Sequence, residues 1–122
     1  MKILFFGSSD ECLPILESLP KNHQVCGIIT KPDKPAGRKQ ILTPSSAKQF
    51  AVSHNIACFT PGNKLELLTF KNQILHCKPD LAIVVDYGLI IPKDIFTLPR
   101  YKTLNIHFSK LPKFRGPSPI PP

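Results

Sequence analysis

Short apolar runs alternate with amphipathic stretches along most of the chain. The runs at residues 2–6, 24–30 and 81–85 are almost wholly apolar, which is typical of strands buried on both faces. Between the first two runs, apolar residues recur at the spacing of one helical face, namely at Cys12, Ile15, Leu16 and Leu19. A strand, a helix and a strand in this order predict a βαβ unit with a right-handed crossover.

The same pattern predicts further elements downstream. Asp10 is expected to cap the first helix, and Ser45 and Ser46 to cap a second one that runs to about His54 and stops at Asn55. A brief strand follows at residues 56–59, an amphipathic helix at 65–77, a short helix with Pro92 at its first position, and a last strand at 103–107. Residues 31–45 carry two Pro, one Gly and several cations at their start, so we expect a long exposed loop without regular structure.

This order of elements is typical of the α/β class. We expect an open, mostly parallel, Rossmann-like sheet with helices on both faces and one domain over residues 1–122. Such sheets bind ligands at the carboxyl ends of their strands, near the point where the strand order reverses. The relevant ends lie at Gly7, after Thr30, at residues 86–92 and from Asn105 onward.

Composition narrows the class of protein. The four Cys form no CxxC pair, which favours reduced thiols, and the first residues lack the length of a signal peptide, so we expect a cytoplasmic protein. No apolar run approaches the ~20 residues that span a bilayer, so no membrane partner is expected. The net charge is +8, and cations gather in residues 31–39 and 93–115. Two interpretations stay open: a basic rim around one mouth that attracts nucleic-acid phosphates, or scattered solubilising lysines.

One polar pair carries candidate chemistry. Asn105 and His107 lie two residues apart in a predicted strand and therefore share a face. An amide can stabilise an oxyanion and an imidazole can move a proton, as acyl-type transfer requires. The alternative is a pair of ordinary polar residues at a strand end. The sequence shows no metal-ligand spacing and no Gly-rich dinucleotide fingerprint.

Four collinear stretches resemble one known family. Asn105-Ile106-His107, followed by Ser-Lys-Leu-Pro-Lys-Phe-Arg-Gly at 109–116, is similar to the signature of the 10-formyltetrahydrofolate-dependent formyltransferases. Within them, Lys-Pro-Asp-Lys-Pro-Ala-Gly-Arg at 31–38 resembles the basic loop of the methionyl-tRNA formyltransferases. Asp-Tyr-Gly-Leu-Ile-Ile-Pro-Lys at 86–93 is similar to their folate-pocket loop. Phe-Gly-Ser-Ser-Asp at 6–10, with Pro14, Leu16, Glu17 and Leu19, is similar to their opening strand and helix.

The resemblance implies the formyltransferase fold and transfer of a formyl group from 10-formyltetrahydrofolate to the amine of initiator methionyl-tRNA, without a metal. Asn105 would hold the oxyanion, and His107 would polarise the centre or protonate the leaving nitrogen. The cofactor-binding residues it implies are Val85, Asp86, Tyr87, Gly88, Leu89, Ile90, Ile91, Pro92, Ser109, Lys110, Leu111 and Pro112. Those implied for tRNA are Arg38, Lys39, Lys113 and Arg115.

The resemblance also implies parts that these 122 residues lack. The family's catalytic Asp, its last sheet strands and its tRNA-binding barrel would all follow residue 122. We therefore expect the N-terminal part of a catalytic domain, incomplete at its C-terminus, with little or no formyl transfer by this chain alone. The alternatives are a non-catalytic folate- or RNA-binding remnant, or a formyltransferase acting on a nucleotide sugar or glycinamide ribonucleotide. A monomer is expected for the full-length family.

Overall fold

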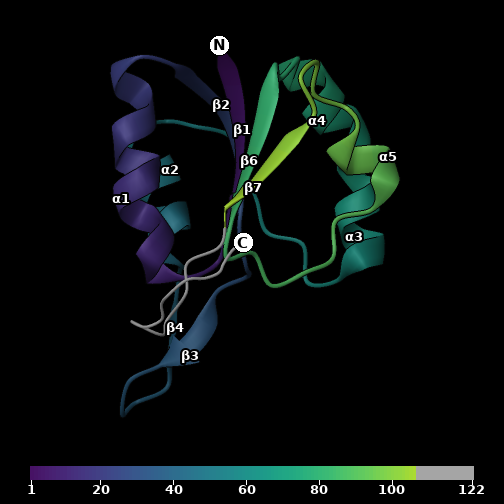
Figure 1. The fold of residues 1–122 in the computed structure, drawn as a ribbon. Helices are drawn as coiled ribbons and strands as arrows, with labels where there is room; N and C mark the ends of the chain where they lie inside the picture. Colours follow the sequence, from purple (N-terminus) through teal and green to yellow (C-terminus); the bar gives the residue numbers. More distant parts are fainter. Residues whose placement is uncertain (107–122) are drawn as a thin grey trace, which may run out of the picture.

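A five-stranded parallel sheet forms the centre of the computed structural model, which describes residues 1–106 (Figure 1). Its strands, in spatial order, are β5 (Cys58–Phe59), β2 (Gln24–Ile29), β1 (Lys2–Gly7), β6 (Leu81–Val85) and β7 (Thr103–Ile106). The chain moves outward from β1 through β2 to β5 and then crosses to β6 and β7. The strand order therefore reverses between β1 and β6.

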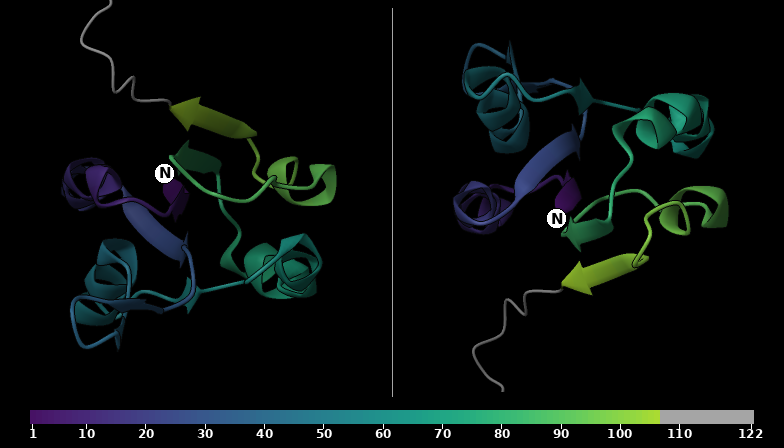
Figure 2. Two further views of the ribbon diagram at one scale, coloured as in Figure 1. Left: turned by 90° about the horizontal axis from the view of Figure 1, so that it is seen from below. Right: turned by 90° about the horizontal axis from the view of Figure 1, so that it is seen from above.

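Helices cover both faces of this sheet, as Figure 2 shows along the strands. One layer holds α1 (Leu13–Ser18), flanked by 3-10 turns η1 (Asp10–Cys12) and η2 (Leu19–Lys21), and α2 (Ser46–Ser53). The other holds α3 (Lys64–Thr69), α4 (Lys71–Cys77) and α5 (Lys93–Phe96). The α/β class and the parallel, Rossmann-like sheet predicted from the sequence are confirmed.

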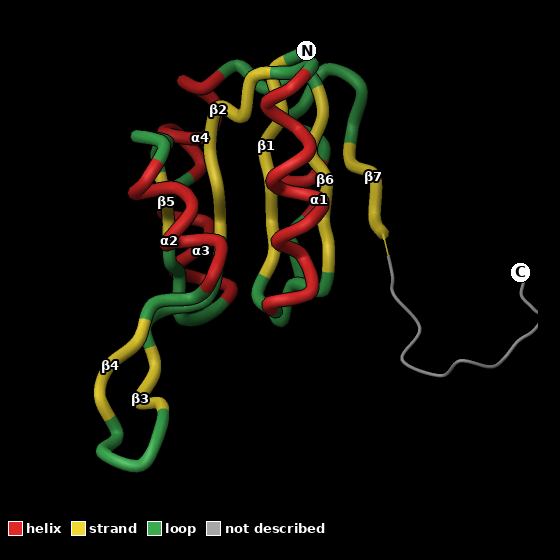
Figure 3. Tube along the Cα trace, turned by 90° about the vertical axis from the view of Figure 1, so that its left-hand side faces the viewer, coloured by secondary structure: helices red, strands yellow, loops and turns green. Residues whose placement is uncertain are grey.

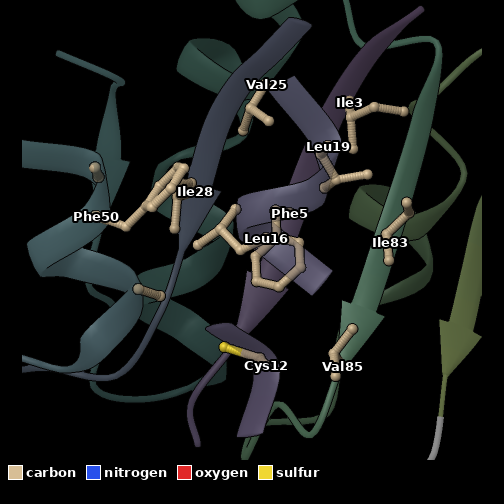
Figure 4. Packing of buried hydrophobic residues seen from close by; sticks show 12 residues of the cluster. Ile3, Phe5, Cys12, Leu16, Leu19, Val25, Ile28, Phe50, Ile83 and Val85 are labelled. Carbon is tan, nitrogen blue, oxygen red and sulfur yellow. The ribbon is translucent and has the colours of Figure 1, made fainter. Parts of the chain in front are cut away.

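The core follows from the two-residue period of β1. Ile3 and Phe5 pack toward α1 and α2, where Figure 4 shows them among Leu16, Ile28 and their neighbours. Leu4 and Phe6 belong to the second cluster, under α3, α4 and α5. All four side chains are at most 1 % exposed. A strand buried on both faces needs apolar residues at every position, which is why residues 3–6 carry no polar side chain.

The second helical cap was predicted correctly. The Ser45 hydroxyl accepts a hydrogen bond from the Lys48 backbone N–H at 3.1 Å, and Asn55 takes the left-handed conformation (φ 56°) just after α2. Ser45 also forms a buried 2.7 Å hydrogen bond with Thr30, which follows β2. This pair joins the start of α2 to the carboxyl edge of the sheet.

Residues 31–45 are not the unstructured loop that their composition predicted. They contain an antiparallel hairpin of β3 (Lys34–Ala36) and β4 (Ile41–Thr43), which projects from the carboxyl edge of the sheet (Figure 3). Pro35 is compatible with this short two-stranded ribbon because the ribbon has only edge strands. Gly37 takes a positive φ of 75° in the turn that closes the hairpin.

Three smaller predictions were also wrong. The expected helix at 65–77 is two helices, because Phe70 takes φ −90° and ψ 3° between α3 and α4. Its ring packs on the second core cluster and lies 5.1 Å from the Phe59 ring, so tertiary packing overrides the helical period there. Pro92 is the N-cap of α5 rather than its first residue. Asp10 begins η1 and its carboxylate accepts from the Ser46 hydroxyl instead of capping the helix.

Candidate active site at the carboxyl edge of the sheet

The loops after β1 and β6 meet where the strand order reverses. The Ser8 backbone N–H donates to the Asp86 carbonyl at 3.2 Å, and the Gly88 N–H donates to the Ser8 hydroxyl, also at 3.2 Å. The Ser9 hydroxyl donates to the Asp86 carboxylate at 3.3 Å. Three hydrogen bonds therefore fix the two loops to each other at the position where open α/β sheets bind their ligands.

A cavity of about 570 Å³ opens beside this junction, over the ends of β6 and β7. Its walls are mostly apolar, and its few polar side chains come from the loop after β6 and from β7. The lining residues are Val84, Asp86, Tyr87, Leu89, Ile90, Ile91, Phe96, Thr103 and Asn105. The size and the apolar character with a few convergent polar groups are those of a small-molecule site.

Asn105 reaches the cavity because of the register between β6 and β7. It is the pairing partner of Val84, so both side chains lie on the same face of the sheet, and both line the cavity. Asn105 is exposed, and its amide makes no hydrogen bond with any other residue in the described range 1–106. The amide is therefore free to bind a ligand.

Tyr87 forms a wall of the cavity. Its ring contacts Phe6 edge-on with centroids 5.4 Å apart, and burial raises the pKa of its hydroxyl to about 12. The hydroxyl oxygen is buried and has no hydrogen-bond partner among the described residues. The ring therefore lines the cavity, while the hydroxyl is a buried donor without a partner behind the cavity surface.

A second, smaller cavity of about 220 Å³ adjoins the first and shares Tyr87 and Leu89 with it. Lys31 and Lys34 lie in its wall with Ser8 and Gly88. The only ion pair within residues 1–106 is Lys48–Asp33 at 2.9 Å, so neither Lys31 nor Lys34 is neutralised by a described carboxylate. Sequence reasoning missed these two lysines as site residues, although the basic run at 31–38 contains them.

The loop predicted to bind the cofactor is divided between several places. Asp86, Tyr87, Leu89, Ile90 and Ile91 line the large cavity. Of the other three, Val85 is buried under the α1 face, Gly88 lines the small cavity, and Pro92 caps α5. Sequence reasoning also missed three cavity residues, Val84, Phe96 and Thr103, which only the β6–β7 register and the position of α5 bring there.

The basic residues do not form one rim. Arg38 and Lys39 lie exposed in the turn between β3 and β4, away from the large cavity. The expectation that the cations of residues 93–115 border the same mouth is wrong for Arg100 and Lys102. They precede β7 and bond to the residues before and at the start of β6, so they lie at the amino edge of the sheet. The remaining predicted site residues, His107, Ser109, Lys110, Leu111, Pro112, Lys113 and Arg115, lie outside the described residues.

The described part of the chain offers neither a metal site nor a membrane-spanning helix. Residues 1–106 contain no group of three or more His, Cys, Asp or Glu side chains that could hold a metal ion. None of the described helices is long and apolar enough to cross a membrane.

Comparison with known proteins assigns the family. The model of the formyl transferase family matches residues 1–121. The chain belongs to the formyl transferase family. Among curated proteins it is 45 % identical to a methionyl-tRNA formyltransferase of Sulfurihydrogenibium sp. and 47 % identical to one of Hydrogenobaculum sp.. It is 38 % identical to the one of Bacillus subtilis.

These formyl transferase relatives are longer than the chain. Each alignment covers 98 % of this chain but only 38–39 % of the relative. The chain thus spans about two fifths of the length of the curated relatives it matches. The large cavity and the loops around the strand reversal all lie within the part that matches the formyl transferase family.

Proposed function

We propose that this chain forms the formyl-donor part of a site that transfers a formyl group from 10-formyltetrahydrofolate to the amine of initiator methionyl-tRNA. The observation that carries the proposal is that Asn105 and the 86–91 loop, which are far apart in sequence, line one cavity. Membership of the formyl transferase family and the similarity to methionyl-tRNA formyltransferases support the same reaction.

The proposed chemistry assigns a role to each polar group. Attack by the substrate amine on the formyl carbon places negative charge on the formyl oxygen, and the Asn105 amide would donate a hydrogen bond to it. His107 would carry the proton between the amine and the leaving folate nitrogen. We propose that the family's catalytic Asp, which the resemblance places after residue 122, supplies the carboxylate that acts with His107. The chain is then the N-terminal part of a catalytic domain.

The cavity suits the flat ring system of a folate. Leu89, Ile91 and Phe96 offer apolar walls, and Asp86, Thr103 and Asn105 offer polar groups. We propose the 85–92 loop, through its backbone groups and side chains, and Ser109 to Pro112 as the binding residues for the formyl donor.

Contact with tRNA is proposed for the hairpin and for residues beyond the described part. Arg38 and Lys39 lie at the tip of a hairpin that projects from the carboxyl edge, so they can reach a polyanion that approaches the cavity from outside. Lys113 and Arg115 are proposed as further phosphate contacts.

Binding of the formyl donor is tested on the 122-residue chain by titration with 10-formyltetrahydrofolate or its stable 5,10-dideaza analogue. Leu89→Glu places a charge in the cavity wall and is expected to weaken binding about tenfold or more, since a charge must be desolvated there. Leu65→Glu, on the exposed surface of α3, is the matched control and should bind like the wild type. Equal affinities for both variants would reject the cavity as the donor site.

The transfer step is tested in a chimera that joins residues 1–122 to the remainder of the Hydrogenobaculum sp. relative. The chimera should formylate methionyl-tRNA, whereas the 122-residue chain should not. Asn105→Ala in the chimera should lower kcat about 10²–10³-fold and leave donor affinity nearly unchanged, because the amide acts on the developing oxyanion. A variant with full kcat would contradict the proposed role of Asn105.

A further inference from the structure

Two cysteines meet at the amino edge of the sheet, away from the candidate active site. Cys26 lies in β2 and Cys77 is the last residue of α4. The Cys77 thiol donates to the Cys26 carbonyl at 3.4 Å, across 51 positions of sequence. For the other two cysteines, Cys12 and Cys58, no second thiol is among the described groups that shift the pKa.

The β1–β2 register breaks at Cys26. Ile3 pairs with Val25 but Leu4 pairs with Gly27, so Cys26 is an extra residue of β2 without a partner on β1. Such a bulge changes the face toward which the following side chains point. The chain passes here from Val25, in the cluster under α1, to Gly27, beside Leu4 in the cluster under α4.

Gly27 lies beside the Cys77 sulfur. A Cβ atom at position 27 would lie 3.5 Å from that sulfur and 3.1 Å from Leu4 Cδ1. A side chain at position 27 would thus contact the end of α4 and crowd Leu4. Burial, followed by the charge and the side-chain hydrogen bond of Cys77, raises the pKa of Cys26 to about 12.

The pair is also accessible to a small molecule. A cavity of about 530 Å³ is lined by both cysteines. Lys2, His23 and His54 lie in the same wall, and no carboxylate does. A carboxylate-bearing reagent would therefore meet a cationic or neutral rim on its way to the two thiols.

We propose that Cys26 and Cys77 form a dithiol site that reacts with small carboxylate-bearing disulfides and closes to an intrachain disulfide. This assignment is independent of the proposed formyl transfer, since the site lies at the opposite edge of the sheet from the large cavity. Closure would fix the last turn of α4 to β2.

The reaction balances with a disulfide RSSR as oxidant. The thiolate of one cysteine attacks RSSR, forms a mixed disulfide and releases RS⁻. The second thiolate attacks the protein sulfur of this mixed disulfide, forms the Cys26–Cys77 bond and releases the second RS⁻. Two thiol protons leave, the protein thiols lose two electrons, and RSSR gains them as two RSH.

Glutathione disulfide is the probe for the test, applied to the folded 122-residue chain and followed by intact mass and peptide mapping. The wild type and Cys58→Ser should both lose the mass of two hydrogen atoms and show one 26–77 link. Cys26→Ser and Cys77→Ser should retain one bound glutathione instead. A wild type that stays fully reduced, stops at mixed disulfides or links another pair would overturn the proposal.

Stability provides a second readout. A bond that closes a 51-residue loop is expected to raise Tm by roughly 10 °C, and added dithiothreitol should remove the increase. Cys58→Ser should show the same increase on oxidation, while Cys77→Ser should show none. If the disulfide-linked protein had a lower Tm than the reduced one, the bond would distort the fold. That result would contradict the proposal that the two cysteines can form a disulfide without a change in the native structure.

Discussion

Single residues around the strand reversal are under tight steric control. A Cβ atom at Gly7 would lie 2.8 Å from both Cys12 Sγ and the Phe5 ring, two atoms that belong to fully buried side chains. Asp86, on the facing loop, takes a positive φ of 51° and is held there by its contacts with Ser8 and Ser9. The junction between the β1 and β6 loops thus depends on one missing side chain and one left-handed residue.

Gly7→Ala is expected to destabilise the protein by about 1–3 kcal/mol, since the added methyl group overpacks a core with no room to give. Gly88→Ala is the control on the facing loop, because its Cβ would meet only the Ser8 hydroxyl at 3.9 Å. That variant should stay within ~0.5 kcal/mol of the wild type. Urea unfolding of both variants gives the comparison, and equal stability would contradict the steric account.

Secondary-structure elements differ in how far the sequence predicts them. The strands β1, β2 and β6 and the cap of α2 follow from local patterns, since buried parallel strands need unbroken apolar runs and Ser45 has a capping side chain. The break at Phe70 depends on packing against Phe59, which no local pattern contains. The β3–β4 hairpin was missed because Pro35 and Gly37 interrupt the pattern expected of strands, although its ladder forms.

In the candidate site, too, some features follow from local sequence patterns and others depend on tertiary structure. The 86–91 loop and Asn105 were predicted as site residues from their motifs, but their common cavity depends on the pairing of Val84 with Asn105 across β6 and β7. Lys31 and Lys34 belong to the small cavity because the strand reversal brings the loops after β1, β2 and β6 together. A linear motif names candidate residues, whereas register and strand order decide which of them meet.

The end of α4 provides a test at the scale of one element. Lys78, its C-cap, takes the left-handed conformation with φ 52° and ψ 55°. The left-handed conformation costs a residue with a Cβ atom about 1 kcal/mol of conformational free energy. Lys78→Gly should therefore raise the free energy of unfolding by about that amount. Gln73→Gly, in the exposed interior of the same helix, should lower it by about 1 kcal/mol. Chemical denaturation should give opposite signs for the two variants.

At the scale of the whole molecule, two cysteine thiols and one tyrosine hydroxyl are buried in their neutral, protonated form. Burial is the first cause that raises the pKa of Cys12 to about 11, of Cys26 to about 12 and of Tyr87 to about 12. The ordinary values are 9.0 for the thiols and 10.0 for the phenol. Each group is therefore still protonated in the folded chain at a pH where the unfolded chain has lost that proton.

Stability should consequently fall in alkali. The native state binds more protons than the unfolded state above about pH 9, so the free energy of unfolding decreases as the pH rises from about 9 to 12 and is unaffected by these groups below that range. Tyr87→Phe should make the upper part of this decline less steep. Tyr101→Phe, at a ring that is 54 % exposed, should follow the wild type. Urea unfolding across this pH range measures the slopes. Identical slopes for the wild type and Tyr87→Phe would show that the Tyr87 hydroxyl has the same pKa in the folded and unfolded chain. Its burial would then contribute nothing to the loss of stability in alkali.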